Sequence, residues 1–223
     1  TKLMLIDPKN GELSKFNLKS SPDFKVVAET FPNMAKDAIE GQAALAYLLT
    51  KNGVANAVTI GAPAAPQIEE DKSQPISPNA PIGFDWSHVD HKGAQNTMWS
   101  YILNSVDSLI TLLKTTKAPG AEKETMWDRS LIYFATEFGR DKTTTGGTGH
   151  HLNNGCLLIS PLLKGNTFFG GLDTNTGLTY GFDTKNGQAS KNKRMKEKHI
   201  YSAICEAFDL DFSGKVSMPV VKS

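Results

Sequence analysis

The chain has 223 residues, of which 39% are hydrophobic and 21% are charged, and its formal net charge is +1. This composition is typical of a globular protein and excludes a disordered or fibrous chain. A net charge so near zero gives no long-range attraction to nucleic acid, and no apolar stretch approaches the ~20 residues that span a bilayer. Because the sequence starts at Thr1 rather than at a methionine, we expect it to be the C-terminal part of a longer protein.

Helical periodicity predicts a first helix over residues 36–50. The apolar run over residues 55–60 predicts a buried strand, and a helix followed by such a strand is typical of an αβ unit in a parallel sheet. Residues 61–82 are rich in Ala, Pro, Gln and acids, so we expect an exposed loop. The clearest helical pattern lies over residues 95–114, where apolar residues fall on one face.

The second half of the chain predicts two more strands, over residues 130–136 and 155–160. The first of these runs is too apolar for a strand with one solvent-exposed face. Residues 165–193 should be a turn-rich excursion, and residues 194–208 a closing helix. Cys156 and Cys205 are too few for a disulfide framework, and the sequence leaves open whether they are bonded to each other.

Two features of this half resemble binding motifs but have simpler explanations. Asp173 and Asp183 are followed by Asn and Gly, as in a calcium loop, yet neither stretch has the trailing carboxylate of such a loop. Asx-type turns are therefore the favoured interpretation. The basic run from Lys191 to Lys198 is interrupted by Glu197 and followed by helical apolar spacing, which favours a solvated helix start.

Three polar clusters follow predicted strands, where α/β proteins place their sites. The first holds two carboxylates and two imidazoles, the second a glutamate and an arginine around a glycine, and the third two adjacent histidines. In chain order their members are Asp85, His88, Asp90, His91, Glu137, Arg140, His150 and His151.

Imidazole and carboxylate together suit zinc, manganese or iron. Asp85 with His88 or His91, plus His150, would give three ligands and leave a position open for water or substrate. The alternative is that these histidines only satisfy hydrogen bonds near a loop-rich sheet edge. Adjacent residues of a strand point to opposite sides, so we expect only one of His150 and His151 to point inward.

Glu137 and Arg140 come directly after the predicted strand over residues 130–136. In a functional site, Glu137 would be a metal ligand or general base and Arg140 would clamp an anion. Alternatively, the two residues pair with each other or with a neighbouring loop. A charged residue at the end of so apolar a strand favours the functional interpretation.

The string Thr136-Glu-Phe-Gly-Arg140, followed closely by Gly147-Thr-Gly-His150-His151, resembles the hallmark of an uncharacterised bacterial family. That family is called domain of unknown function 1501 and belongs to the alkaline phosphatase-like superfamily. In it, a buried strand ends in Ser-Glu-Phe-Gly-Arg, a Gly-Thr-Asp-His turn follows, and an earlier aspartate–histidine segment precedes a long helix. The resemblance covers most of residues 36–212.

The resemblance implies a fold: an α/β three-layer sandwich with a mostly parallel central sheet, alkaline phosphatase-like and incomplete at its N-terminus. Residues 1–223 would then form a single domain. The arrangement is also similar to that of phosphopentomutases, which implies that Glu137 takes the place of a strand-end aspartate and His150 that of a turn histidine. Asp85 with His88 or His91 would match the superfamily's earlier metal-binding pair.

Several positions depart from these families. Phe138 stands where the two-metal enzymes have histidine, and Gly149 stands where both families usually have aspartate. The spacing from Asp85 to His88 differs from the expected Asp-x-His, so His88 and His91 compete for one role. The superfamily's nucleophile lies in an N-terminal strand region that would precede Thr1, so these residues alone do not assemble a complete two-metal site.

The resemblance implies a metal-dependent hydrolase that acts on a phosphate or sulfate ester with zinc, manganese or calcium. A second hypothesis is a catalytically degenerate relative that serves as an exported binding or envelope-assembly protein, with the preceding part of the same protein or an envelope component as partner. A third is a non-enzymatic partner-binding fragment with a large exposed apolar patch. Because the family usually carries an export signal, we expect a periplasmic or cell-surface location.

Overall fold

The computed structural model describes residues 21–62, 84–88, 90–136, 139–140, 149–151 and 154–221. The chain divides into two compact units, Thr1–Met126 and Trp127–Ser223, and each is described here by itself. That residues 1–223 form a single domain stays a prediction. None of the helices in the described residues combines the length and the apolar character needed to cross a lipid bilayer.

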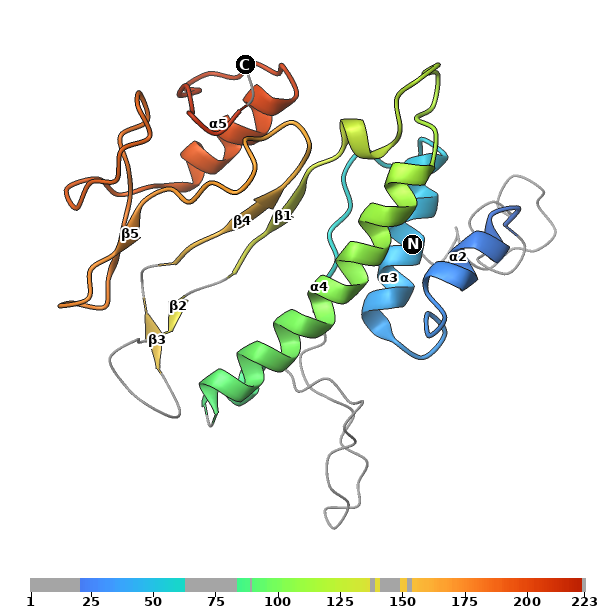
Figure 1. Ribbon diagram of the computed structural model, residues 1–223, viewed down its shortest axis with the longest axis horizontal. Coiled ribbons are helices and arrows are strands. Elements are labelled where there is room, and N and C mark those ends of the chain that lie inside the picture. The colour runs from blue at the N-terminus through green and yellow to red at the C-terminus, as the bar shows by residue number, and fades with distance from the viewer. Residues whose placement is uncertain are drawn as a thin grey trace, which may run out of the picture. The chain divides into compact units, whose positions relative to one another are not determined.

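The first unit is helical. Its core comes mainly from α3 and α4, which lie side by side (Figure 1) and bury Leu48 and Met98 completely. Hydrophobic residues three and four apart create such faces, and packing one face on another removes both from water. In chain order the elements are α2 (Phe24–Thr30), α3 (Ala38–Lys51), the 3-10 helix η3 (Phe84–His88) and α4 (His91–Thr115).

Helix α3 shows how local sequence sets the ends of an element. Asp37 is its N-cap, and one carboxylate oxygen accepts hydrogen bonds from the backbone N–H groups of Ile39 and Glu40, each at 2.9 Å. At the other end the chain turns at Gly53, whose φ of 66° lies in the left-handed region that glycine adopts without strain. The helix predicted over residues 36–50 is therefore confirmed.

The prediction of a strand over residues 55–60 is wrong. These residues form no strand, and Val58 is 39% exposed. Short apolar runs do not by themselves decide between a buried strand and an exposed connection. Of the predicted exposed loop over 61–82, residues 63–82 lie outside the described residues.

The second unit is built on a long β-hairpin arm, which we define as the described residues between 132 and 159. Ile132–Phe134 (β1) pairs antiparallel with Leu157–Ile159 (β4), and between them Gly139–Arg140 (β2) pairs antiparallel with His150–His151 (β3). The two ladders are thus nested, with β1–β4 at the base of the arm and β2–β3 toward its tip (Figure 1). The side chain of Asn154 donates to the carbonyl of Thr136 at 2.8 Å and also to its hydroxyl, which ties the two sides of the arm between the ladders.

The hairpin arm overturns the predicted fold class. Every ladder in the described residues is antiparallel and two-stranded, so the three-layer sandwich with a mostly parallel central sheet is wrong. Parallel neighbours need a crossover connection, usually a helix, whereas the described residues between β1 and β4 hold a second antiparallel pair. The apolar strands predicted over residues 130–136 and 155–160 exist in shortened form, but they are half-exposed: Tyr133 is 41% exposed and Leu157 is 43% exposed.

Two similar turns follow the arm. The first connects Gly171–Leu172 (β5) to its antiparallel partner Thr179–Tyr180 (β6), and the second follows β6. In each, an aspartate side chain accepts from the backbone N–H two residues later, at 3.0 Å for Asp173 and 2.8 Å for Asp183. The carbonyl of the same aspartate accepts from a glycine N–H at 2.8 Å. The predicted Asx turns are therefore confirmed.

Helix α5 (Glu197–Ala207) closes the second unit, as the pattern over residues 194–208 predicted. Its Ala203 packs into a small core with Phe182 and Met218, and Met195 and Leu158 of β4 pack against this cluster. The last helix, the second turn and the base of the hairpin arm thus share one hydrophobic centre.

Candidate functional site

The first predicted cluster lies in the helical unit, at η3 and the start of α4. Asp90 is the N-cap of α4, and its carboxylate accepts from the N–H of Gly93 at 2.9 Å. His88 is exposed at the end of η3, and His91 is the first residue of α4. Asp90 therefore has a structural role as a helix cap. The side chain of Asp85 is outside the described part of the chain.

His91 carries the one unusual polar atom of this cluster. Its Nδ1 is buried and has no hydrogen-bond partner among the described residues. Buried polar atoms are generally satisfied, so an orphaned imidazole nitrogen marks a position where a ligand or a cation could bind. This observation favours His91 over the exposed His88 as the histidine that was predicted to bind a metal together with Asp85.

A row of side chains that the sequence did not single out holds η3 against α4. Ser87 is fully buried and accepts a hydrogen bond from the Gln95 amide at 2.9 Å. Gln95 in turn accepts from the Trp99 indole N–H at 2.9 Å, and Phe84 packs edge-on against Trp99 with ring centroids 5.9 Å apart. The spacing of Gln95 and Trp99, four residues apart, was the one available signal, because such residues are neighbours on a helix surface.

The second and third predicted clusters meet in the hairpin arm. Arg140 of β2 is directly opposite His150 of β3, and Gly139 is opposite His151. Residues directly opposite in an antiparallel ladder present their side chains to the same face, with Cβ atoms about 4.5–5.5 Å apart. Arg140 is half-buried and His150 is exposed. Glu137 lies outside the described residues.

The structure therefore brings together one predicted pair, Arg140 with His150. His88 and His91 belong to the first unit and His150 to the second, and each unit is described by itself. In the described residues there is no group of three His, Cys, Asp or Glu side chains that could hold a metal ion. The residues described thus do not fit a complete metal site, although the orphaned Nδ1 of His91 and the imidazole of His150 are each suitable donors.

Cys156 and Cys205 are both free thiols. The sequence had left open whether they are bonded to each other, and in the structure they are not. Burial raises the pKa of the Cys156 thiol, which lowers its thiolate fraction and its reactivity near neutral pH. Cys205 lies on α5.

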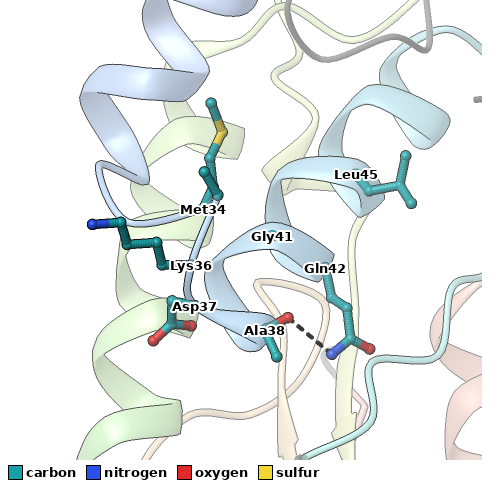
Figure 2. Close-up of a pocket in the computed structure, with 8 residues that line it drawn as sticks. Met34, Lys36, Asp37, Ala38, Gly41, Gln42 and Leu45 are labelled. Carbon is teal, nitrogen blue, oxygen red and sulfur yellow. Dashed lines mark hydrogen bonds between the residues drawn. The ribbon is translucent and has the colours of Figure 1, made fainter. Parts of the chain in front are cut away.

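The first unit contains a hollow of about 420 Å³ at the start of α3, lined in part by Met34, Lys36 and Leu45. Figure 2 shows the Gln42 amide bound to the carbonyl of Ala38, at 2.9 Å; the same amide also donates to the carbonyl of Gly61 at 2.9 Å. A Cβ at Gly41, another lining residue, would lie 2.8 Å from the carbonyl oxygen of Met34, so the close approach there requires glycine.

The Asp37 carboxylate, which lines this hollow, serves the fold. Besides capping α3, Asp37 forms a hydrogen bond with Tyr101. Burial, followed by the bond to Asp37, raises the pKa of the Tyr101 phenol well above its ordinary value. Asp37 and Gln42, two of the polar residues that line the hollow, therefore have partners within the described part of the chain.

Comparisons with protein-family models, with curated proteins and with solved structures found no match to this chain.

Proposed function

We propose that this chain is part of a metal-dependent hydrolase that acts on a phosphate or sulfate ester. The observation that carries the proposal is the cross-strand pair of Arg140 and His150, with the two side chains on one face of the β2–β3 ladder. The local motif resemblance supports it, because Arg140 and His150 both stand in the matching strings and the resemblance gives His150 the place of a metal-binding turn histidine. The proposal concerns the site and does not depend on the fold class predicted from the sequence.

Arg140 would hold the charged ester group. A guanidinium presents two parallel N–H groups that match two oxygens of a phosphate or sulfate, so it fixes orientation as well as charge. Its half-buried position strengthens this attraction relative to a fully solvated cation. Neither a neutral ester nor a cationic substrate would use such a group.

His150 would supply the imidazole nitrogen beside the bound anion. A neutral imidazole either donates a lone pair to a metal ion or accepts a proton from an attacking water. Glu137 would serve as a further ligand or as the general base. The metal, when bound, would supply Lewis acidity and an activated water. We also propose export to the periplasm or cell surface, which fractionation of cells expressing the full-length protein would test.

The test is hydrolysis of p-nitrophenyl phosphate and p-nitrophenyl sulfate with added zinc, manganese or calcium. Arg140→Ala should lower kcat/KM roughly a hundredfold, as the loss of one preorganised charge-stabilising donor does. Arg140→Lys should restore part of the rate, because charge returns without the bidentate geometry. Lys164→Ala is the matched control, since it removes an exposed cation of the same unit outside the ladder.

The opposite result is equally informative. If the full-length protein hydrolyses neither ester with any of the three metals, the hydrolase proposal is wrong. The degenerate binding or envelope-assembly role is then favoured, in keeping with the incomplete metal set of the described residues. Elemental analysis of wild type and His150→Ala, side by side, distinguishes loss of the metal from loss of the chemistry.

A further inference from the structure

The chain holds four Asn–Gly pairs, and three of them lie in the described residues. These are Asn52–Gly53, Asn154–Gly155 and Asn186–Gly187, whereas Asn10–Gly11 lies outside the described residues. An asparagine amide can be attacked by the backbone nitrogen of the next residue. Glycine leaves that nitrogen unshielded, because it has no Cβ and lets the backbone turn freely. The rate at each pair then depends on where the fold holds the nitrogen relative to the amide.

The Asn154–Gly155 pair holds these two groups against each other. The N–H of Gly155 donates to the side-chain oxygen Oδ1 of Asn154 at 2.8 Å. Because Cγ is bonded directly to Oδ1, the nitrogen lies near the carbon that it would attack, and the hydrogen bond also makes that carbon more electrophilic. Two hydrogen bonds from Nδ2 to Thr136 fix which end of the amide is oxygen. Both residues of the pair are exposed, so water reaches them.

The other two described pairs bind the glycine nitrogen to a different oxygen. In Asn52–Gly53 the glycine N–H donates to the carbonyl of Thr50 at 3.1 Å, at the C-terminal end of α3. In Asn186–Gly187 it donates to the carbonyl of Asp183 at 2.8 Å, inside the second Asx turn. A nitrogen bound in this way must first leave its backbone partner before it can attack the amide. The fold therefore slows the reaction at these two pairs.

We propose that Asn154 is a site of spontaneous deamidation, which this geometry builds into the hairpin arm. The Gly155 nitrogen loses its proton to hydroxide, and its electron pair forms a bond to Cγ of Asn154. The Cγ–Nδ2 bond then breaks, and Nδ2 keeps the electron pair, takes a proton from water and leaves as ammonia. Water opens the resulting succinimide ring at either of its carbonyls, which gives aspartate or isoaspartate. The overall change consumes water and releases ammonia, so water is the one co-reactant.

Deamidation removes the tie between the two ladders of the arm. Nδ2 of Asn154 donates to the carbonyl and to the hydroxyl of Thr136, whereas a carboxylate has no proton to donate to that carbonyl. The product also places a negative charge beside a carbonyl oxygen. The β2–β3 ladder, which pairs Arg140 with His150, then opens more often. The modification is thus a slow loosening of the arm, and it does not depend on the proposed hydrolase activity.

The test is ageing of the full chain in mildly alkaline buffer, followed by digestion and mass spectrometry of the peptides that contain Asn52, Asn154 and Asn186. A parallel sample in urea gives the rate of each pair in the unfolded chain, which removes differences caused by neighbouring residues. We expect folding to slow Asn52 and Asn186 about tenfold or more and to slow Asn154 less than about threefold. Equal protection of all three asparagines by folding would overturn the proposal.

Gly155→Ala tests whether the glycine nitrogen is the attacking group. The substitution fits the fold, because no heavy atom lies within 4 Å of the added Cβ and the φ of Gly155 is outside the left-handed region. The methyl group shields the nitrogen, so deamidation at Asn154 should slow about tenfold in the folded chain. Unchanged rates at Asn52 and Asn186 in the same sample show that the fold is kept. An unchanged rate at Asn154 would contradict the proposed attack.

Asn154→Asp mimics the product and tests its effect on the arm. Hydrogen exchange of the Arg140 and His150 amides should be about threefold faster or more than in wild type, because the tie to Thr136 is lost. Asn186→Asp is the matched control in the same unit. Its oxygen still accepts from the N–H of Gln188, so the exchange at the arm should stay that of wild type. If Asn154→Asp also exchanges like wild type, the proposed loosening is wrong.

Discussion

The two units use their apolar residues in opposite ways. In the helical unit the inward-facing apolar side chains of α3 and α4 are almost fully buried, with Leu48 and Met98 at 0% exposure. In the second unit, strands that are just as apolar leave Tyr133 and Leu157 more than two-fifths exposed. The apolar stripe of a helix therefore predicts which face of the helix is buried. An apolar run in a strand predicts only that burial of the strand is favourable, not that it occurs.

The largest expected effect comes from the helical core. Leu48→Ala should lower the free energy of unfolding by about 2–5 kcal/mol, because it removes buried methyl groups and leaves a cavity. Leu103→Ala on α4 is the matched control, since Leu103 is 38% exposed and the same change there should cost about 0.5 kcal/mol or less. Urea denaturation measures both, and equal losses would mean that the packing of α3 on α4 is wrong.

A smaller effect separates the two helix starts. Asp37 caps α3 with two hydrogen bonds, so Asp37→Ala should cost about 0.5–2 kcal/mol. The N-cap of α5 is Lys196, whose side chain cannot accept a hydrogen bond, so Lys196→Asp should instead stabilise by about 0.5–1 kcal/mol. Thermal denaturation, monitored by circular dichroism, measures whether each substitution lowers or raises the stability. A loss of stability in Lys196→Asp would show that this lysine has a role beyond the helix cap.

The smallest effect concerns acid sensitivity in the turns of the second unit. The hydrogen bond from Lys191, then the Asn175 N–H, lowers the pKa of Asp173. A lowered pKa means that the stabilisation is present above the unfolded value of about 3.9 and is lost as the pH falls through the folded value. Lys191→Met should move the pKa of Asp173 upward, as an NMR titration of its carboxyl carbon would show. Lys185→Met should leave it unmoved, and 1 M salt should mimic Lys191→Met in part.

Local rules made much of the fold predictable. Three helices could be predicted, because helical spacing, caps and glycine act within a few residues of each other. They are the helices over residues 36–50, 95–114 and 194–208. The turns at Asp173 and Asp183 were readable for the same reason. The direction of the strands could not be predicted in this way. Whether β1 pairs parallel or antiparallel with its partner depends on the path of the long connection between them, and no short stretch of sequence determines that path.

The candidate site was predictable in part. The sequence singled out Arg140 and His150 by residue type and by their position after an apolar strand, but not that they would be paired across a ladder. It missed Asn154, since an asparagine in a connection is most often a turn residue rather than a tie between strands. It also missed the buried Ser87, because burial of a small hydroxyl depends on what packs over it.

The nesting of the two ladders has a consequence for how the hairpin arm opens. The β2–β3 ladder can separate while β1–β4 stays closed, but separating β1–β4 frees the whole arm. Backbone amides of Arg140 and His150 should therefore exchange with deuterium faster than those of Tyr133 and Leu158. An ester bound across Arg140 and His150 would slow that exchange by favouring the closed ladder, so local protection could reveal the ligand before any product is seen.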